Sequence, residues 1–208
     1  MPMTLPLPGV IEPLAFENVE GCEYVNGEWV EKHPTEWIEA EHDRRGCEFV
    51  DGDWKEKNLS ASSDLVIVRL LSELEQHARP TKLGRVQGPE CGYQCFPVEP
   101  KRVRKPDVSF ILAGRLPASQ RKGNVRIAPD FAAEVTSPND IADDLGQKVM
   151  EYLSVGVKLV WIVYPETKSV WVFRSDGTGS WHSISGELSG EDVIPGFKTS
   201  LDTLFADD

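Results

Sequence analysis

Apolar residues recur at helical spacing in two stretches of the chain. The first, residues 64–77, follows a serine-rich helix start at residues 60–63, and Arg79-Pro80 is expected to end it. The second, residues 140–155, has a similar stripe. The pattern therefore predicts two amphipathic helices. The apolar positions of the first helix are Ile67, Leu70, Leu71 and Leu74.

Five further segments have the short apolar or alternating pattern typical of β-strands. They are residues 92–96, 106–112, 130–136, 159–164 and 169–174. Residues 190–204 are expected to form a short strand or turn and a closing helix. Strands that alternate with helices indicate an α/β or α+β fold, in which helices cover both faces of a sheet.

An internal repeat occupies the beginning of the chain. Residues 21–32 return 25 residues later as residues 46–57, with eight of twelve positions identical. Each copy has an Asn-Gly or Asp-Gly pair between aromatic and β-branched residues, which favours a two-residue hairpin turn. We therefore expect two β-hairpins, the first within an extension at residues 1–45 and the second at the start of the main domain, residues 46–208.

Charge is unevenly distributed along the chain. The 208 residues include 22 basic and 34 acidic side chains, and the net charge of −12 argues against a nucleic-acid partner. Residues 64–127, however, hold 12 basic and 6 acidic side chains, a net +6. A solvated basic loop and a phosphate-binding surface both explain this excess. The candidate nucleic-acid contacts are Lys101, Arg102, Arg104, Lys105, Arg121 and Lys122.

Composition also bears on where the protein works. Hydrophobic residues make up 40% of the chain, enough for one substantial core. The longest apolar stretch, residues 159–164, is too short to cross a bilayer, and residues 1–11 lack the basic start of a secretory signal. Four cysteines are sparse for a disulfide scaffold of this length. We expect a cytoplasmic protein with reduced thiols and no membrane partner.

Two carboxylates stand at unusual places in the predicted strands. Pro106-Asp107 begins one predicted strand, so Asp107 lies at the N-terminal end of that strand. Glu134 lies within the otherwise apolar run at residues 131–135. A carboxylate rarely occupies such a position without an ion pair, a proton or a bound divalent cation. Because Mg²⁺ and Mn²⁺ prefer carboxylate oxygens, the pair is a candidate metal site.

A lysine interrupts the apolar stripe of the second helix. Lys148 could lie at the edge of the stripe with a salt bridge to Asp144, or it could reach back over the sheet to the two carboxylates. The second arrangement would supply what phosphodiester hydrolysis requires: acids that hold a cation, and a lysine that positions water or stabilises negative charge. The apolar positions of this stripe are Ile141, Leu145, Val149 and Tyr152.

Taken in order, these motifs resemble a known family. They are Lys105-Pro106-Asp107-Val108, residues 133–138, Asp144 through Lys148 to Tyr152, Gly156-Val157, residues 160–163 and Pro195-Gly196-Phe197. Over residues 46–205 the chain is similar to the Uma-two family of restriction endonucleases, within the PD-(D/E)XK nuclease superfamily. The resemblance implies a restriction-endonuclease-like α/β fold, with a mixed β-sheet core flanked by helices and here an N-terminal β-hairpin extension.

The resemblance also implies roles for individual residues. Asp107 and Glu134 would ligate Mg²⁺, or Mn²⁺ in its place, with the Val135 carbonyl as a third ligand. Lys148 would be the catalytic lysine, which the superfamily usually carries two residues after the acid, where this chain has Thr136. Three accessory candidates remain, although helix capping, a surface ion pair and packing explain them as well. They are Asp64, Glu73 and Tyr152.

Three functions are therefore open. The first is a Mg²⁺-dependent endonuclease that cleaves DNA as a homodimer, since two strands need two cuts. The second is a catalytically silent nuclease fold that binds DNA or a protein partner through its basic middle and its duplicated hairpins. The third is a thiol-based metal or redox protein using Cys91 and Cys95, whose spacing matches neither a redox dithiol nor a standard zinc clamp. Asp107, Glu134 and Lys148 together favour the first.

Overall fold

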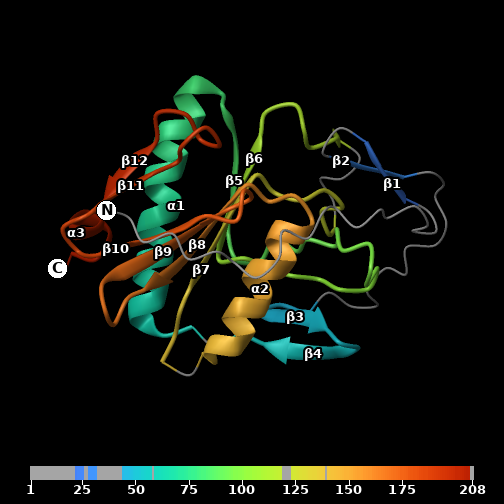
Figure 1. Cartoon of the computed structure of the whole chain (residues 1–208), viewed down its shortest axis with the longest axis horizontal. Helices are drawn as coiled ribbons and strands as arrows, with labels where there is room; N and C mark the ends of the chain where they lie inside the picture. The colour runs from blue at the N-terminus through green and yellow to red at the C-terminus, as the bar shows by residue number, and fades with distance from the viewer. Residues whose placement is uncertain are drawn as a thin grey trace.

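A six-stranded β-sheet forms the centre of the molecule (Figure 1). The computed structural model describes residues 22–25, 28–31, 44–57, 59–118, 123–138 and 140–206. Across the sheet the strands follow the order β10-β9-β8-β7-β6-β5. Their bounds are β5 Gly84–Gln87, β6 Val108–Leu112, β7 Phe131–Val135, β8 Leu159–Tyr164, β9 Ser169–Arg174 and β10 Gly179–His182.

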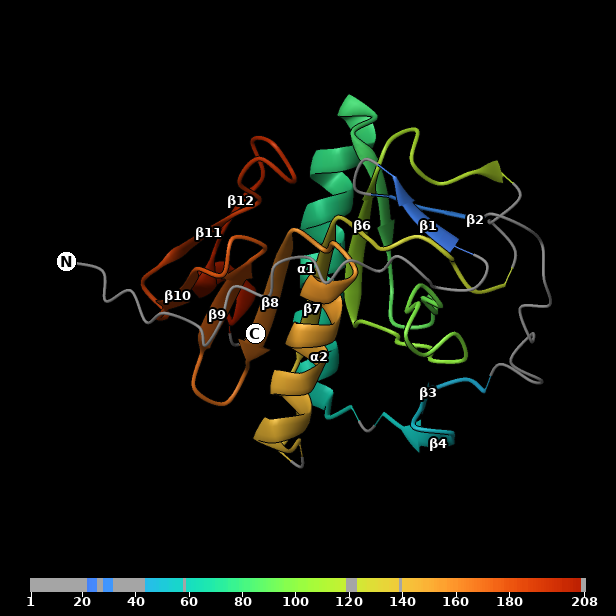
Figure 2. The same ribbon diagram turned by 45° about the vertical axis from the view of Figure 1, so that its right-hand side comes forward.

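Two helices cover the two faces of this sheet (Figure 2). They are α1 (Ala61–Thr81) and α2 (Ala142–Ser154). β7 and β8 pair in parallel with α2 as the crossover between them, whereas the other four neighbouring strand pairs are antiparallel. The predicted mixed sheet flanked by helices is therefore confirmed. None of the helices in the described parts of the chain is long and apolar enough to span a membrane.

Side chains of the central strands alternate between two cores. In β7, Phe131, Ala133 and Val135 pack with α1, whereas Ala132 packs in the core that contains α2. Because successive strand residues point to opposite faces, Glu134 falls on the α2 face with Ala132. The same alternation assigns Ile111 of β6, and Asp107 four residues before it, to the α2 face. The strand period thus directs both carboxylates toward one side of the sheet.

Both predicted hairpins are present. β1 (Cys22–Val25) pairs with β2 (Glu28–Glu31), and β3 (Cys47–Val50) pairs with β4 (Asp53–Glu56) in the same register. In the second copy the Asp-Gly pair at residues 51–52 has φ angles of 54° and 81°. These positive values are what a two-residue turn between twisted strands requires.

The second hairpin docks against the segment that leads into β6. Phe49 exchanges two backbone hydrogen bonds with Val103, at 3.1 and 2.9 Å. Trp54 packs on Phe49 with ring centroids 5.2 Å apart, and the guanidinium of Arg44 lies 5.7 Å from the Trp54 centroid. This hairpin therefore lies beside the main sheet, as predicted. The side chain of Trp29, its counterpart in the first copy, is outside the described residues.

Residues 92–96 do not form the predicted strand. Tyr93 makes isolated bridges to Arg104 and Val125, and the segment is apolar because it is buried in the core beside α2. The edge of the sheet is instead β5, which the sequence pattern did not predict. A Cβ on Gly84 would meet the Ile111 carbonyl oxygen at 2.3 Å, so the close pairing of β5 with β6 requires a glycine that weakens the strand pattern.

The helices and the C-terminal part differ in detail from the prediction. α1 continues through Pro80, since the fixed φ of proline is compatible with a helix, and ends before Lys82, whose φ is 53°. Ile141, expected on the buried stripe, is 63% exposed because it precedes the first turn of α2. The strands β10 and β11 (Glu187–Ser189) were not predicted. The predicted short strand and closing helix are β12 (Lys198–Ser200) and α3 (Leu201–Leu204).

Candidate active site

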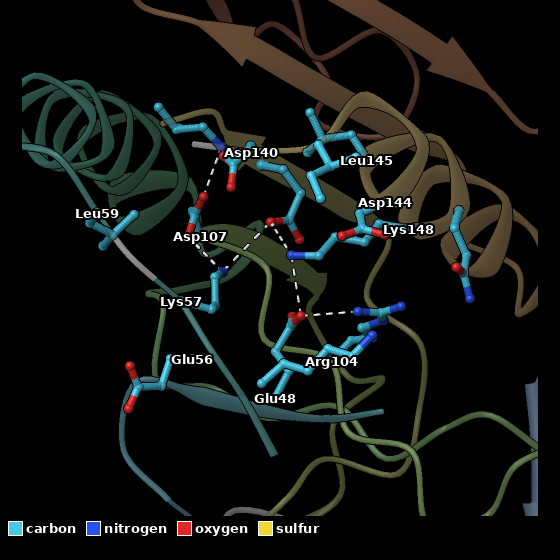
Figure 3. Close-up of a pocket in the computed structure, with 15 residues that line it drawn as sticks. Glu48, Glu56, Lys57, Leu59, Arg104, Asp107, Asp140, Asp144, Leu145 and Lys148 are labelled. Atoms are coloured by element: carbon cyan, nitrogen blue, oxygen red, sulfur yellow. Dashed lines mark hydrogen bonds and ion pairs between the residues drawn. The ribbon is translucent and has the colours of Figure 1, made fainter. Parts of the chain in front are cut away.

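Asp107 and Glu134 lie beside each other at one end of β6 and β7. Val108 is opposite Ala133 in this antiparallel pair, so extending the register by one residue sets Asp107 opposite Glu134. Opposite residues of antiparallel strands share a face. The two residues are 1% and 3% exposed, and both line one cavity of about 220 Å³ (Figure 3). The two carboxylates therefore meet the first requirement for sharing a cation.

A lysine from the second hairpin lies between these carboxylates. Lys57, directly after β4, has its Nζ 2.7 Å from Asp107 Oδ1 and 3.6 Å from Glu134 Oε2. The Val135 N–H donates to Asp107 Oδ2 at 2.7 Å, and the Tyr152 hydroxyl donates to Glu134 Oε1 at 2.6 Å. Each carboxylate is thus held by a donor at one oxygen and faces Lys57 with the other.

Lys148 enters the same cavity from α2. Its Nζ lies 3.1 Å from Glu134 Oε2 and 3.2 Å from Glu48 Oε2. Among the described residues it makes no ion pair with Asp144, an exposed residue that also lines the cavity. The helix that follows β7 therefore carries this lysine back over the sheet, which is the second of the two arrangements that the sequence left open.

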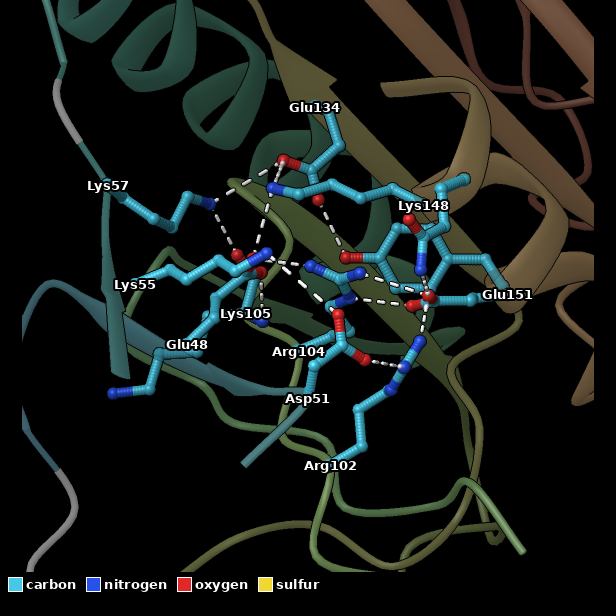
Figure 4. Close-up of polar contacts among 12 residues, drawn as sticks. Glu48, Asp51, Lys55, Lys57, Arg102, Arg104, Lys105, Glu134, Lys148 and Glu151 are labelled. Carbon is cyan, nitrogen blue, oxygen red and sulfur yellow. Dashed lines mark hydrogen bonds and ion pairs between the residues drawn. The ribbon is translucent and has the colours of Figure 1, made fainter. Parts of the chain in front are cut away.

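Glu48 joins the second hairpin to this site. Its Oε1 accepts a hydrogen bond from the Lys105 N–H at 2.8 Å, and its Oε2 pairs with Arg104 Nη1 at 3.0 Å and with Lys148. Arg104 pairs in turn with Glu151 of α2 at 2.6 Å. Carboxylates and cations thus alternate from the cavity toward the outer end of the hairpin (Figure 4).

Most of the basic segment that was predicted to contact nucleic acid is buried. Arg102, Arg104 and Lys105 are 6%, 5% and 0% exposed, so their charges pair with carboxylates of this chain and do not form the predicted basic surface. Lys101 is exposed, and residues 121–122 lie outside the described residues. The carboxylates that pair with Arg102 are Asp51, Glu99 and Glu151.

Neighbouring cations hold Glu48 in its charged form. Burial raises the pKa of this carboxyl, but the attraction of Lys148, Lys57 and Arg104 outweighs burial and lowers the pKa to about 2. A carboxylate with so low a pKa remains ionised at neutral pH. Glu48 therefore contributes a permanent negative charge beside the cavity.

Burial and neighbouring charges shift the pKa values of Asp107, Tyr152 and Lys57. Burial raises the pKa of Asp107, and the ammonium of Lys57 offsets this only in part. Burial also raises the pKa of Tyr152, and the negative charge of Glu134 raises it further, so the hydroxyl stays a donor. The pKa of Lys57 is raised because the nearby carboxylates outweigh the effect of burial. Lys57 is therefore a cation at every ordinary pH.

The three accessory candidates occupy different places. Tyr152 belongs to the cavity, where it donates to the carboxylate of β7. Asp64 is exposed in the first turn of α1 and does not cap this helix, because Ser60 Oγ accepts the Ser63 N–H at 3.1 Å and begins the helix four residues earlier. Glu73 lines a separate groove on α1. Of the three, Tyr152 alone touches the carboxylate pair.

Sequence reasoning missed Glu48 and Lys57 as members of the site. A signal was available, because both belong to the eight positions that are identical in the two hairpin copies, where their counterparts are Glu23 and Lys32. Charged residues kept in both copies of a repeat indicate a role beyond forming the hairpin. What the sequence could not show is that this hairpin folds back onto the carboxylates.

The carboxylate pair has the donor chemistry of a Mg²⁺ or Mn²⁺ site. Hard cations take oxygen ligands, and Mg²⁺ commonly uses one or two carboxylates and completes its shell with water and phosphate oxygens. Asp107 Oδ1 and Glu134 Oε2 already face one positive group, and Val135 lines the same cavity. Among the described residues, no group of three or more His, Cys, Asp or Glu side chains is arranged to hold a metal. The residues present therefore fit a cation held by two carboxylates.

Cys91 and Cys95, the two thiols of the alternative function, do not form a competing site. Burial raises the pKa of Cys91, and it raises the pKa of Cys95 to about 12. Thiols must lose their proton to act as nucleophiles or metal ligands, and these two remain protonated at neutral pH. The structure thus gives no support to a thiol-based function.

The sheet and its helices have a restriction-endonuclease-like α/β arrangement, and one cavity holds a buried acid pair together with Lys148. Proteins of the restriction-endonuclease-like class combine such a fold with such a site. A family model described as "Putative restriction endonuclease" matches residues 31–203. The chain belongs to this family, Uma2. The match confirms the predicted family, and it begins in the first hairpin copy, ahead of residue 46.

A solved structure shows the same fold. It is the crystal structure of "a putative nuclease belonging to DUF820 from Anabaena variabilis ATCC 29413". The likeness has a TM-score of 0.65 and 18% sequence identity, and it covers 76% of this chain and 89% of that one. A comparison with curated proteins gives no match.

Proposed function

We propose that this protein is a divalent-cation-dependent nuclease that hydrolyses the phosphodiester bonds of DNA. The observation that carries the proposal is the convergence of buried Asp107, just before β6, buried Glu134 of β7 and partly buried Lys148 of α2 on one cavity. Membership of the Uma2 family supports nuclease chemistry over other hydrolytic reactions.

Each residue of the site has a separate role in this reaction. Asp107 and Glu134 would hold Mg²⁺ together with the Val135 carbonyl oxygen. A cation bound there polarises the phosphate and lowers the pKa of a bound water. Lys148 positions the attacking water or stabilises the negative charge that develops on the phosphate. Tyr152 fixes the orientation of Glu134 through its hydrogen bond of 2.6 Å.

The substrate determines the assembly that we propose. Both strands of duplex DNA are cut when two active sites act together, so we expect a homodimer with twofold symmetry. Phosphate contacts outside the cavity are assigned to the exposed Lys101 and, from the sequence alone, to Arg121 and Lys122.

One observation favours a second function. The ammonium of Lys57 lies between the two carboxylates, and a pair that is permanently neutralised in this way would not hold a cation. The protein would then be a silent nuclease fold that binds nucleic acid or another protein. Cleavage assays separate the two functions.

The test is cleavage of plasmid, oligonucleotide and RNA by the wild type and by Glu134→Ala, in Mg²⁺ and in Mn²⁺. We expect the wild type to cut DNA, EDTA to stop the reaction, and Glu134→Ala to lose about 100-fold or more in rate because a ligand is removed. Glu166→Ala, at an exposed glutamate between β8 and β9, is the matched control and should cut like the wild type.

Two results would change the proposal. DNA binding without cleavage in either metal would support the silent module. Cleavage of RNA and not of DNA would keep the chemistry and correct the substrate.

A further inference from the structure

The mechanism above gives no role to Lys57, although this residue contacts both carboxylates. Its Nζ lies 2.7 Å from Asp107 Oδ1 and 3.6 Å from Glu134 Oε2, and its side chain is 12% exposed. The same group donates a hydrogen bond to the Lys105 carbonyl oxygen. Lys57 enters the cavity from the hairpin, whereas Lys148 enters from α2 (Figure 3).

The buried carboxylates of the cavity already have cationic partners. Three buried carboxylates face three cationic side chains across contacts of 2.7 to 3.6 Å. Three exposed acids also line the cavity, namely Glu56, Asp140 and Asp144. Buried charges are tolerated when they are paired, so a divalent cation beside the carboxylate pair would add positive charge next to lysines that already pair with it. Binding of a divalent metal therefore requires that a cationic side chain leave the cavity or that an anion enter it. The six paired residues are Asp107, Glu134 and Glu48, with Lys57, Lys148 and Arg104.

Among the described residues, Lys57 is the cation that contacts both carboxylates of the pair, whereas Lys148 contacts Glu134 and Glu48. A Mg²⁺ ion lies about 2.1 Å from each oxygen that it binds. The Lys57 ammonium is within 2.7 and 3.6 Å of one oxygen from each carboxylate, so a cation held by both carboxylates would lie close to it. Two cations this close repel each other strongly in a buried site. The ion and the ammonium therefore exclude each other.

We propose that Lys57 is a built-in counter-ion that competes with the divalent cation for Asp107 and Glu134, so that the metal binds only when this lysine withdraws. The inference rests on the proposed function, because the site that Lys57 occupies is the proposed metal site. The lysine withdraws by rotation of its flexible side chain, while its backbone N–H remains bonded to the Gly46 carbonyl at 2.8 Å.

The withdrawn Lys57 ammonium needs a new negatively charged partner. A phosphate that enters the cavity brings the negative charge that both the divalent cation and the displaced Lys57 require. Nucleic acid and metal therefore bind with positive coupling, and each raises the affinity of the protein for the other.

The counter-ion role predicts that neutralising Lys57 strengthens metal binding in the absence of nucleic acid. Mn²⁺ affinity of the full chain is measured by titration calorimetry and by electron paramagnetic resonance of free Mn²⁺, for the wild type, Lys57→Met and Lys55→Met. Lys55 is the matched control, since it is exposed and lines the same cavity but pairs with Asp51 at 4.0 Å and not with Asp107 or Glu134. We expect about a tenfold or greater fall in Kd for Lys57→Met and less than about a threefold change for Lys55→Met.

A second variant and a second measurement guard against loss of folding. Lys57→Gln keeps a donor near Asp107 without the charge, and melting temperatures are recorded with and without Mn²⁺. If Lys57→Met unfolds without metal, Mn²⁺ should restore its fold, because the ion replaces the missing positive charge and binds the folded state alone. Failure of Mn²⁺ to stabilise either variant more than the wild type contradicts the counter-ion role.

The remaining outcomes separate this inference from the nuclease proposal. Equal or weaker Mn²⁺ affinity in Lys57→Met, with cleavage by the wild type, overturns the counter-ion role alone. An equal gain in Lys57→Met and Lys55→Met also overturns it, because net charge then explains the effect. Tighter Mn²⁺ binding without cleavage by any of these proteins overturns the nuclease function alone. No Mn²⁺ binding by any of them overturns both.

Discussion

Lys148 lies between the buried residues Leu145 and Val149, and its ammonium meets two carboxylates instead of solvent. The charge of a lysine on an apolar stripe needs a negatively charged partner. The sequence offers two, namely Asp144 on the same helix and the strand carboxylates. The tertiary structure selects the strand acid, because β7 ends at Val135 and the chain soon turns into α2. The amine therefore lies in the cavity beside Glu134 and Glu48.

Replacing Lys148 with alanine should abolish cleavage and leave metal affinity largely intact. The lysine acts on water or phosphate and is not a ligand, so we expect a fall in kcat of about 100-fold or more. Plasmid cleavage and Mn²⁺ titration measure the two properties separately. Lys198→Ala, at an exposed lysine paired with Glu187 at 2.7 Å, serves as the control. Cleavage by Lys148→Ala at the wild-type rate would refute the role of this lysine.

At the scale of elements, the β3–β4 hairpin is tied to the core by charge as well as by its backbone. Glu48 receives a backbone N–H at 2.8 Å and pairs with Arg104 and Lys148 at 3.0 and 3.2 Å. These partners come from the segment before β6 and from α2. One buried side chain therefore connects three parts of the fold.

Glu48→Gln should flatten the acid dependence of stability. The pKa of Glu48 is about 2 in the folded protein against an ordinary 4.5, so its stabilising effect is complete above pH 4.5 and is lost as the pH falls toward 2. Over that window the wild type should lose on the order of 3 kcal/mol more of its unfolding free energy than the variant. The raised pKa of Asp107 acts in the opposite sense, but it is common to both proteins and cancels in the difference.

Urea unfolding from neutral pH down to about pH 2 provides this measurement. Glu56→Gln, at an exposed glutamate of β4, is the control and should keep the wild-type slope. Parallel losses in the wild type and Glu48→Gln would show that Glu48 is not held ionised by its neighbours.

At the scale of the whole molecule, the sheet, both cores and the second hairpin all follow residue 45. Deleting residues 1–45 should therefore leave a folded domain. The buried Lys105 Nζ, however, donates to the Arg44 carbonyl at 3.1 Å. A deletion that ends at residue 43 keeps this acceptor and should be more stable by about 1 to 2 kcal/mol.

Circular dichroism and urea unfolding of the two shortened chains test this division. Unfolding of both would place the first hairpin copy within the core. Equal stability of both would show that the Arg44 carbonyl contributes nothing to Lys105.

The elements that the sequence predicted well are those whose pattern persists over their whole length. β8 and β9 have the predicted bounds, since each is a continuous run of strand-forming residues between turns. The sequence pattern does not predict β5, because Gly84 weakens it. It predicts a strand at residues 92–96, because burial in a core selects the same residue types as a strand does. The residue types of a short segment indicate that the segment is buried, and they say less about whether its backbone forms the hydrogen bonds of a strand.

The residue pattern predicts the order of the helices and long strands, and it singles out Asp107, Glu134 and Lys148 because a charge inside an apolar pattern must have a partner. Which charges pair depends on how the chain folds. Arg104 is 56 residues from Glu48, and Lys57 is 50 residues from Asp107, so no local spacing relates them. The folding of a hairpin onto a strand end brings them together, so that Arg104, predicted to contact DNA, pairs with Glu48 and Glu151 instead.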